Sequence, residues 1–252
     1  MKQFIITLFF VLVATVFPMS NAVAAGAAVE LEDADVDLNN KQSLQRGAKY
    51  FVNYCMGCHS LKFSRYNRMA RDIGLSDDQV EANLIFTMND KGEPTEVAAL
   101  MENAMQEENA ANWFGQAPPD LSLVARSRGA DWIYSFLKAF YADPSRPLGV
   151  NNTVFANTGM PHVLWELQGM QHLEEHDDGN GHKTQELVLE EPGKATPTEY
   201  DQIVRDITAF LVYVGEPAKL HRKTIGVWVL LFLAVFFVVA YFLKKEYWKD
   251  VH

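Results

Sequence analysis

The sequence is poor in cysteine and in positive charge. Only two cysteines occur among 252 residues, and both lie in one short stretch, so a framework of disulfides is excluded. Lys and Arg number 22 against 32 Asp and Glu, and the formal net charge of -10 argues against a nucleic-acid-binding protein. A hydrophobic content of 48% is typical of a folded chain, and the length allows one or two domains.

The two cysteines, Cys55 and Cys58, are followed by His59 in a C-x-x-C-H motif, the spacing of covalent haem attachment. On a helix these positions project from one face, so both thiols can form thioethers to a haem whose iron the imidazole ligates. A zinc site would need further ligands, and the sequence has no third cysteine. A thioredoxin-like site would need a βαβ pattern, which is not evident. The motif therefore predicts a c-type haem protein.

The first 25 residues have the pattern of a cleaved secretory signal. Lys2 supplies a positive charge, residues 4–17 form an apolar core, and Ala24 and Ala25 are small residues suited to cleavage. The core would span only about 21 Å as a helix, against about 30 Å for a bilayer core, which disfavours an uncleaved anchor. Export agrees with the motif, because haem is joined to c-type cytochromes outside the cytoplasm.

A second apolar run, residues 225–243, carries no charge and is long enough, at about 28 Å, to cross a bilayer. We expect a transmembrane anchor at 221–245 and a cytoplasmic tail at 246–252. Three Lys or Arg flank each end of the run, so the positive-inside rule does not orient it. The N-terminal signal does, and it places residues 26–220 outside the cytoplasm.

Residues 26–220 predict one mainly α-helical domain with long loops. The acidic opening, residues 30–37, is expected to be an extended arm. Capping boxes at Ser76 and Thr196 predict two helix starts, and residues 185–189 one strand of a small hairpin after a turn at 177–181. Apolar residues at helical spacing extend over Leu44, Ala48, Phe51 and Cys55, over Val80, Leu84, Ile85 and Met88, over Ile133, Phe136, Leu137 and Phe140, and over Ile203, Ile207, Phe210, Leu211 and Val214.

The iron of such a haem needs a second axial ligand. Met160 is the favoured candidate, because it lies in the loop 157–161, where Gly159 and Pro161 constrain the backbone. Methionine ligation raises the potential relative to bis-histidine ligation and suits electron transfer. His162 is the alternative. Among the other candidates, Met101 and Met105 are expected to pack on a helix, Met88 and Met170 lack a comparable turn, and three histidines in an acidic segment are expected to be solvated (His172, His176 and His182).

The non-ligating nitrogen of His59 also needs a partner, which is usually a carbonyl or a carboxylate. Pro118 and Pro119 offer carbonyls that are not committed to a helix, so one of these is a candidate. The pair could equally serve only as an extended connector, and both interpretations stay open.

The ordered set of motifs resembles the cytochrome c1 family, the c-type haem subunits of cytochrome bc1 complexes. The set comprises CMGCHS at 55–60, APPDLS at 117–122, MP at 160–161 and LHRK at 220–223 before the anchor, so it covers nearly the whole chain. The resemblance implies a class I cytochrome-c-like haem domain and one covalently attached haem c. It also implies attachment at Cys55 and Cys58 and axial ligation by His59 and Met160.

The resemblance further implies a role and partners. The haem would accept an electron from the Rieske iron–sulfur protein, which oxidises quinol at cytochrome b, and pass it to a soluble or tethered cytochrome c. The chain itself would have no catalytic site, and it would sit in a dimeric complex of the cell inner membrane with its haem domain in the periplasm. Clusters of acidic residues could steer a basic cytochrome c towards it.

The same resemblance draws attention to two basic residues and two absences. Arg126 and Arg128 match a basic pair of the family and are candidates for haem propionate contacts, with surface solvation as the alternative. An arginine before the proline pair and a cysteine pair before the methionine, found in some relatives, are missing here. Residues 141–157 are therefore expected to hold Met160 by packing alone.

Two other classes of protein stay open. One is the monohaem cytochrome c subunit of a terminal oxidase or a nitric-oxide reductase, which commonly keeps an uncleaved N-terminal anchor. The other is a ligand-binding haem sensor or enzyme with an open iron site.

Overall fold

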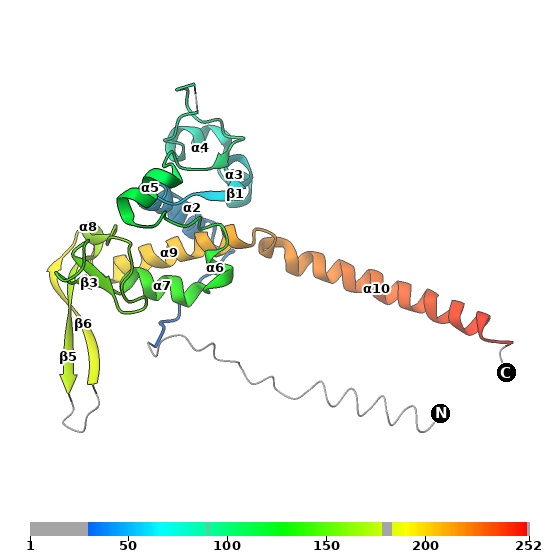
Figure 1. Cartoon of the computed structure of the whole chain (residues 1–252). Helices are drawn as coiled ribbons and strands as arrows, with labels where there is room; N and C mark the ends of the chain where they lie inside the picture. Colours follow the sequence, from blue (N-terminus) through cyan, green and yellow to red (C-terminus); the bar gives the residue numbers. More distant parts are fainter. Residues whose placement is uncertain (1–29, 90, 178–182, 251–252) are drawn as a thin grey trace.

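The computed structural model describes residues 30–89, 91–177 and 183–250 of the chain. The signal predicted for residues 1–25 lies outside the described residues. Two groups of elements lie on either side of the long helix α9 (Pro197–Gly215), with α3, α4 and β1 in one group and α6, α7 and β3 in the other (Figure 1). The sheets of the described residues are two-stranded, so the predicted mainly α fold with long loops is confirmed.

The helices are α2 (Lys41–Tyr50), the π-helix η1 (Phe51–Cys55), α3 (Tyr66–Ile73), α4 (Asp77–Leu84), α5 (Glu107–Phe114), α6 (Val124–Ser127), α7 (Ala130–Lys138), α8 (Trp165–Gln168), α9 and α10 (Lys219–Tyr247). The strands are β1 (Leu61–Arg65), β2 (Leu100–Met101), β3 (Phe140–Ala142), β4 (Val150–Asn152), β5 (Gly169–Asp177) and β6 (Lys183–Pro192).

Helices α2 and α9 form the centre of the core. They approach so closely that a Cβ atom added to Gly47 would overlap the carbonyl oxygen of Asp206. The Asp206 carboxylate is buried beside this crossing and accepts hydrogen bonds from Ser43 Oγ (2.6 Å) and Arg46 Nε (2.6 Å). A buried carboxylate is tolerated only when it is paired and hydrogen-bonded, so these contacts fix the position of α2 along α9.

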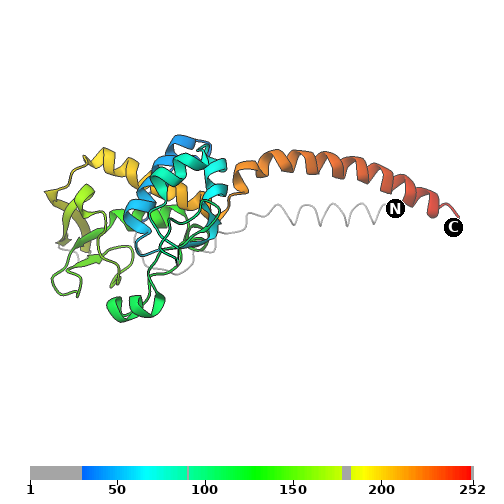
Figure 2. The ribbon, with the colours of Figure 1, turned by 90° about the horizontal axis from the view of Figure 1, so that it is seen from above.

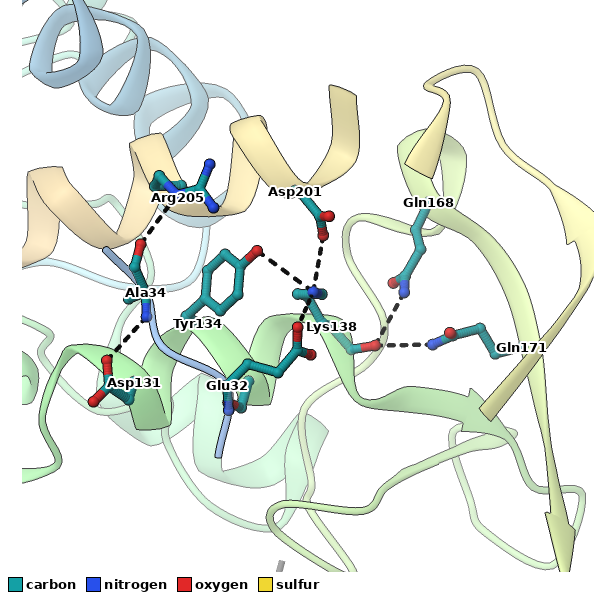
Figure 3. A network of polar contacts seen from close by, with 10 residues as sticks. Glu32, Ala34, Asp131, Tyr134, Lys138, Gln168, Gln171, Asp201 and Arg205 are labelled. Atoms are coloured by element: carbon teal, nitrogen blue, oxygen red, sulfur yellow. Dashed lines mark hydrogen bonds and ion pairs between the residues drawn. The ribbon is translucent and has the colours of Figure 1, made fainter. Parts of the chain in front are cut away.

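The acidic arm is extended, as predicted, but it is bound to the domain. Ala34 is fully buried; its N–H donates to Asp131 Oδ1 (3.0 Å) in α7, and its carbonyl accepts from Arg205 Nε (3.1 Å) in α9 (Figure 3). Glu32 forms an ion pair with Lys138 at the end of α7. The arm therefore ties α7 to α9.

The capping motifs predicted the two helix starts correctly, whereas the apolar spacing predicted some helix ends too far along the chain. Ser76 and Gln79 form the predicted capping box at the start of α4, but the helix ends at Leu84 rather than continuing to Met88. Met88 instead pairs with Pro94 in an isolated bridge. The backbone partner across the loop overrides the helical spacing.

The two ends of α9 agree with the sequence. Thr196 and Glu199 form the predicted capping box with Pro197 in the first turn, and the helix ends at Gly215.

Met101, which we expected on a helix, is instead buried in β2 and pairs with Leu61 of β1.

The apolar stripe at 133–140 also ends earlier than predicted. Helix α7 stops at Lys138, and Phe140 begins β3, which pairs with β4 in the register Phe140 to Asn152. The predicted hairpin is confirmed and is longer than expected, because β5 and β6 pair from Gly169–Pro192 outward. It projects from the domain on the side away from α10 (Figures 1 and 2).

Helix α10 leaves the domain as one long rod in both views (Figures 1 and 2). It has 29 residues, a mean hydropathy of 2.7 in its most apolar window, and no residue of that window buried within the chain. At about 1.5 Å per residue it is longer than a bilayer core. Among the described residues it is the one helix with the length and composition of a membrane span, as predicted.

Candidate haem site

The C-x-x-C-H motif lies directly after the helix that packs on α9. Leu44, Ala48, Phe51 and Cys55 are all buried, as their spacing predicted. The regular α-helix ends at Tyr50, however, and continues as the π-helix η1, in which Met56 N donates to Phe51 O (2.9 Å). Such single wide turns occur often at functional sites, because they re-aim the side chains beyond them.

Cys55, Cys58 and His59 are brought together by one turn rather than by the regular helix we expected. The Cys55 carbonyl accepts hydrogen bonds from Cys58 N (3.0 Å) and His59 N (2.9 Å). The two cysteines carry free thiols, Cys55 buried and Cys58 half-buried, and burial raises the pKa of Cys55 to about 12. The turn therefore presents two thiols at a fixed spacing, which is the arrangement that two thioether bonds require.

The imidazole of His59 is held by the proline pair. Its Nδ1 lies 2.7 Å from the carbonyl oxygen of Pro119, which confirms one of the two interpretations of Pro118 and Pro119. A carbonyl only accepts, so Nδ1 carries the proton and Nε2 keeps a free lone pair. Burial lowers the pKa of His59 despite the opposing hydrogen bond to Pro119. The ring is thus held neutral and in one tautomer, with Nε2 available to a metal.

The Pro119 carbonyl is itself positioned by the next residues of the chain. Asp120 Oδ2 accepts from Lys62 N (2.8 Å) of β1, and Leu121 N donates to Ser60 O (3.0 Å). These bonds pair the segment after the prolines with the segment after the haem motif. Sequence reasoning did not single out Asp120, although an aspartate after two prolines is a signal for a side-chain-capped turn.

A cavity of about 430 Å³ lies beside the C-x-x-C-H turn. It reaches Cys58 and the two prolines, and Met105 lines it from a loop rather than from the expected helix. His59 and Met160 are not part of its lining. Two free thiols, an imidazole with a free Nε2 and an adjacent cavity nevertheless form a donor set that fits haem c. No three His, Cys, Asp or Glu side chains of the described residues gather as an alternative metal-ion site.

Met160 comes from a separate part of the fold, the loop between β4 and α8. Its side chain is half-buried and packs against the hydrophobic core. The left-handed residue of this loop is Asn157, with φ 61°, and not Gly159, at which a Cβ would meet open space. The prediction that Gly159 constrains the backbone was therefore wrong, and asparagine fills the position because it tolerates that conformation.

The expectation that the preceding segment acts by packing alone was also wrong. The side chains of Asn151 and Asn152 hydrogen-bond to the loop backbone at Val154, Phe155 and Asn157. Sequence reasoning did not single out these two asparagines, although asparagine bonded to the backbone two or three positions on is a common turn pattern.

His162, the alternative ligand, is built into the core on the other side of the same loop. Its ring stacks on Phe140, with centroids 5.1 Å apart and planes 5° from parallel, and burial lowers its pKa to about 4. Its Nε2 is buried and has no hydrogen-bond partner among the described residues. The stack explains the ring as a packing residue. The unpaired Nε2 leaves His162 as the alternative ligand.

The two arginines of the basic pair have other neighbours. The Arg128 guanidinium lies over the rings of Trp132 (5.1 Å) and Phe155 (5.8 Å). Arg126 lines a cavity of about 200 Å³ with Glu216 and Lys219, where α9 passes into α10. Their contact with haem propionates stays a prediction.

Relatives of known name match the chain along its length. A family model described as "Cytochrome C1 family" matches residues 34–251. The chain is 48% identical over 255 residues to a protein of Allochromatium vinosum named cytochrome c1, covering all of both chains. It is 29% identical over 226 residues to the mitochondrial haem protein cytochrome c1 of Neurospora crassa, covering 82% of this chain and 62% of that one.

One similar protein carries a different name. The chain is 46% identical over 243 residues to a Nitrosomonas europaea protein named ammonia monooxygenase gamma subunit, covering 96% of this chain and 98% of that one.

The contacts of Asp120 generate a test of the His59 side of the site. Asp120→Ala is expected to free the Pro119 carbonyl and to weaken ligation by His59 by on the order of tenfold, as is typical for the outer partner of a ligand. Electron paramagnetic resonance of the ferric protein reports this change in axial ligand field. Asp120→Asn keeps an acceptor for Lys62 N and is the matched control. An unchanged spectrum in Asp120→Ala would mean that the prolines hold the carbonyl unaided.

Proposed function

The chain belongs to the cytochrome c1 family, and from this premise we propose that it relays electrons as the haem c subunit of a cytochrome bc1 complex. The observation that carries the proposal is the match of the family model over the domain and the C-terminal helix together, residues 34–251. A monohaem subunit of a terminal oxidase or a nitric-oxide reductase is not favoured, because relatives named cytochrome c1 match this chain from bacteria and from mitochondria.

Four residues hold the cofactor in this proposal. Cys55 and Cys58 would hold haem c through two thioether bonds, and His59 Nε2 and Met160 Sδ would ligate its iron. When bound, haem c supplies reversible one-electron chemistry at a potential that its ligands and surroundings tune. The geometry supports the assignment of His59, whose Nε2 stays unprotonated because Nδ1 donates to Pro119.

The protein residues supply position and environment rather than chemistry. A neutral imidazole and a neutral thioether add no charge at the iron, and a thioether ligand stabilises the reduced state relative to a second imidazole. As the second iron ligand, Met160 would also exclude exogenous ligands. This suits electron transfer and disfavours the ligand-binding sensor.

The membrane topology is the second part of the proposal. Residues 1–25 are removed as a signal, 26–220 form the haem domain in the periplasm, 221–245 span the inner membrane and 246–252 end in the cytoplasm. The length and composition of α10 support a single span. The orientation rests on the N-terminal signal pattern, which implies export of the residues after it.

The partners are those of the complex. The anchor lies against cytochrome b, the Rieske protein donates the electron, and a cytochrome c accepts it, within a dimeric assembly. Between residue 26 and Lys219 the chain has 30 Asp and Glu against 16 Lys and Arg. This excess supports a basic acceptor, with steering confined to acidic residues within about 8 Å of the docking site at physiological salt.

The mass of the mature chain tests attachment and cleavage together. The expected mass is that of a polypeptide beginning near residue 26 with one haem added, and acid–acetone should not extract the colour. Cys55→Ala and Cys58→Ala should each keep at most one thioether, and the double variant none. A mature chain that starts at Met1, or a wild-type haem that extracts, contradicts this part of the proposal.

The axial ligand is tested by Met160→Leu, with His162→Phe as its matched partner. Axial ligands set haem potentials over about 0.8 V, so loss of the thioether should lower the potential by on the order of 0.1 V and abolish the thioether-to-iron charge-transfer band. His162→Phe keeps the ring stack on Phe140 and should leave both unchanged. The reverse pattern would assign the ligand to His162.

The role is tested by purification of the chain in mild detergent. Cytochrome b and a Rieske protein should co-purify, and quinol should reduce the haem in that preparation in a manner that Rieske inhibition blocks. Recovery with subunits of an ammonia monooxygenase instead would favour the role named for the Nitrosomonas europaea relative.

A further inference from the structure

The loop that carries Met160 has little secondary structure of its own, yet its backbone is held by two neighbouring side chains. We infer that Asn151 and Asn152 are positioning residues that hold Met160 at the axial site. The inference rests on the proposed ligand role of Met160 and adds the means by which the loop is held.

Asn152 connects the loop to the end of α7. Its side chain is almost completely buried, at 1% exposure. Its Oδ1 accepts from Val154 N (2.9 Å) and Phe155 N (3.0 Å), and its Nδ2 donates to Phe136 O (2.8 Å). Backbone N–H groups only donate and carbonyls only accept, so the orientation of this amide is fixed by its partners.

Asn151 holds the next part of the loop. Its Oδ1 accepts from Asn157 N (2.8 Å) and from the N–H of Asn152 (2.9 Å), and its Nδ2 donates to Asp143 Oδ2 (2.9 Å). The bond to Asn157 N reaches the residue with positive φ, three positions before Met160. Together the two amides satisfy four backbone N–H groups in the nine residues that precede the ligand.

The end of α7 is a fixed point for this attachment. The last carbonyls of a helix lack partners within the regular helix, and here side chains from β4, α8, β5 and α9 donate to them. Asn152 donates to Phe136 O, Tyr200 Oη of α9 donates to Leu137 O (2.8 Å), and Gln171 Nε2 of β5 donates to Lys138 O (2.8 Å; Figure 3).

The Lys138 side chain adds a second tie at the same place. Its Nζ lies 2.8 Å from Asp201 Oδ1 of α9 and pairs with Glu32 of the arm (Figure 3). Burial alone would lower the pKa of Lys138, but the hydrogen bonds to Asp201 and Glu32 outweigh it and raise the pKa. The amide of Asn152 is therefore bonded to a helix end that is itself tied to α9 and to the arm.

This arrangement has a consequence for the ligand. A thioether is a neutral, weak ligand, so the closed site depends on the loop being held before the sulfur binds. Removing the Asn152 amide deletes the bonds that join Val154 and Phe155 to Phe136 O, and removing the Asn151 amide deletes those that join Asn157 to Asp143. Water can then replace the lost partners of the solvent-accessible loop backbone, so opening of the loop costs less free energy. Loop opening withdraws Met160, so the two asparagines control the closed fraction of the site and not only the stability of the domain.

The test compares Asn152→Ala and Asn151→Ala with Tyr200→Phe in the full chain in detergent. Tyr200→Phe removes a buried hydrogen bond to the neighbouring carbonyl of the same helix end but none to the loop. All three should lower the melting temperature. Only the two asparagine variants should lose the thioether-to-iron charge-transfer band, lower the midpoint potential and bind carbon monoxide in the ferrous state.

Two further variants make the outcome decisive. Asn152→Asp keeps both accepted bonds and should retain more of the band than Asn152→Ala, and it replaces that variant if the alanine chain does not fold. Met160→Leu in parallel tests the ligand itself. If Met160→Leu loses the band while the asparagine variants keep wild-type band, potential and carbon monoxide response, the positioning role is overturned and the ligand stands. If Met160→Leu keeps the band, the ligand assignment falls and this inference falls with it.

Discussion

The tight crossing of α2 and α9, where Gly47 meets the backbone of Asp206, sets the position of the helix that leads into the C-x-x-C-H turn. Helix α2 continues through η1 into the haem motif, and α9 is followed, after a short connection, by the membrane helix α10. The buried carboxylate of Asp206, paired with Arg46 and Ser43, keeps the two helices from sliding. One helix crossing thus connects the C-x-x-C-H turn to the helix that precedes the membrane anchor. A defined position of the turn relative to the anchor suits a relay whose haem must meet partners in the same membrane complex.

The two proposed axial ligands are held by different physical devices. His59 sits one turn beyond a packed helix, and a rigid proline carbonyl fixes its ring. Met160 sits in a loop whose backbone depends on the amides of Asn151 and Asn152. A helix satisfies its own backbone groups, whereas a loop must borrow partners, so the methionine side is the one where local opening costs less. In a chain without a disulfide at this loop, buried amides and the capped end of α7 provide the restraint.

The sequence predicted most of what is local. The C-x-x-C-H spacing, the capping boxes at Ser76 and Thr196 and the uncharged run at 225–243 each depend on residues within a few positions of one another. The partner of His59 was also within reach, although Pro119 is 60 positions away, because two successive prolines leave their carbonyls uncommitted to a helix. Helix ends were harder to predict: Met88 and Phe140 continue a helical spacing, yet Met88 pairs with Pro94 across a short loop and Phe140 pairs with Asn152 of β4.

What the sequence alone determined is therefore the cofactor and the anchor, and it also predicted the attachment points and the imidazole ligand, since each prediction depends on one short stretch of residues. What only the tertiary structure decided is how the chain holds them: the π-helical turn before Cys55, the docking of the acidic arm through Ala34, and the amide contacts of Asn151 and Asn152. The π-helical turn and the bonds from the asparagines to the loop backbone are local, whereas the arm bonds to residues that lie 97 and 171 positions away and Asn152 bonds to Phe136 O, 16 positions away. Only folding brings these distant donors and acceptors together. Asparagine commonly bonds to backbone N–H groups two or three positions on, but which more distant carbonyl its amide reaches, here Phe136 O, is fixed only by folding.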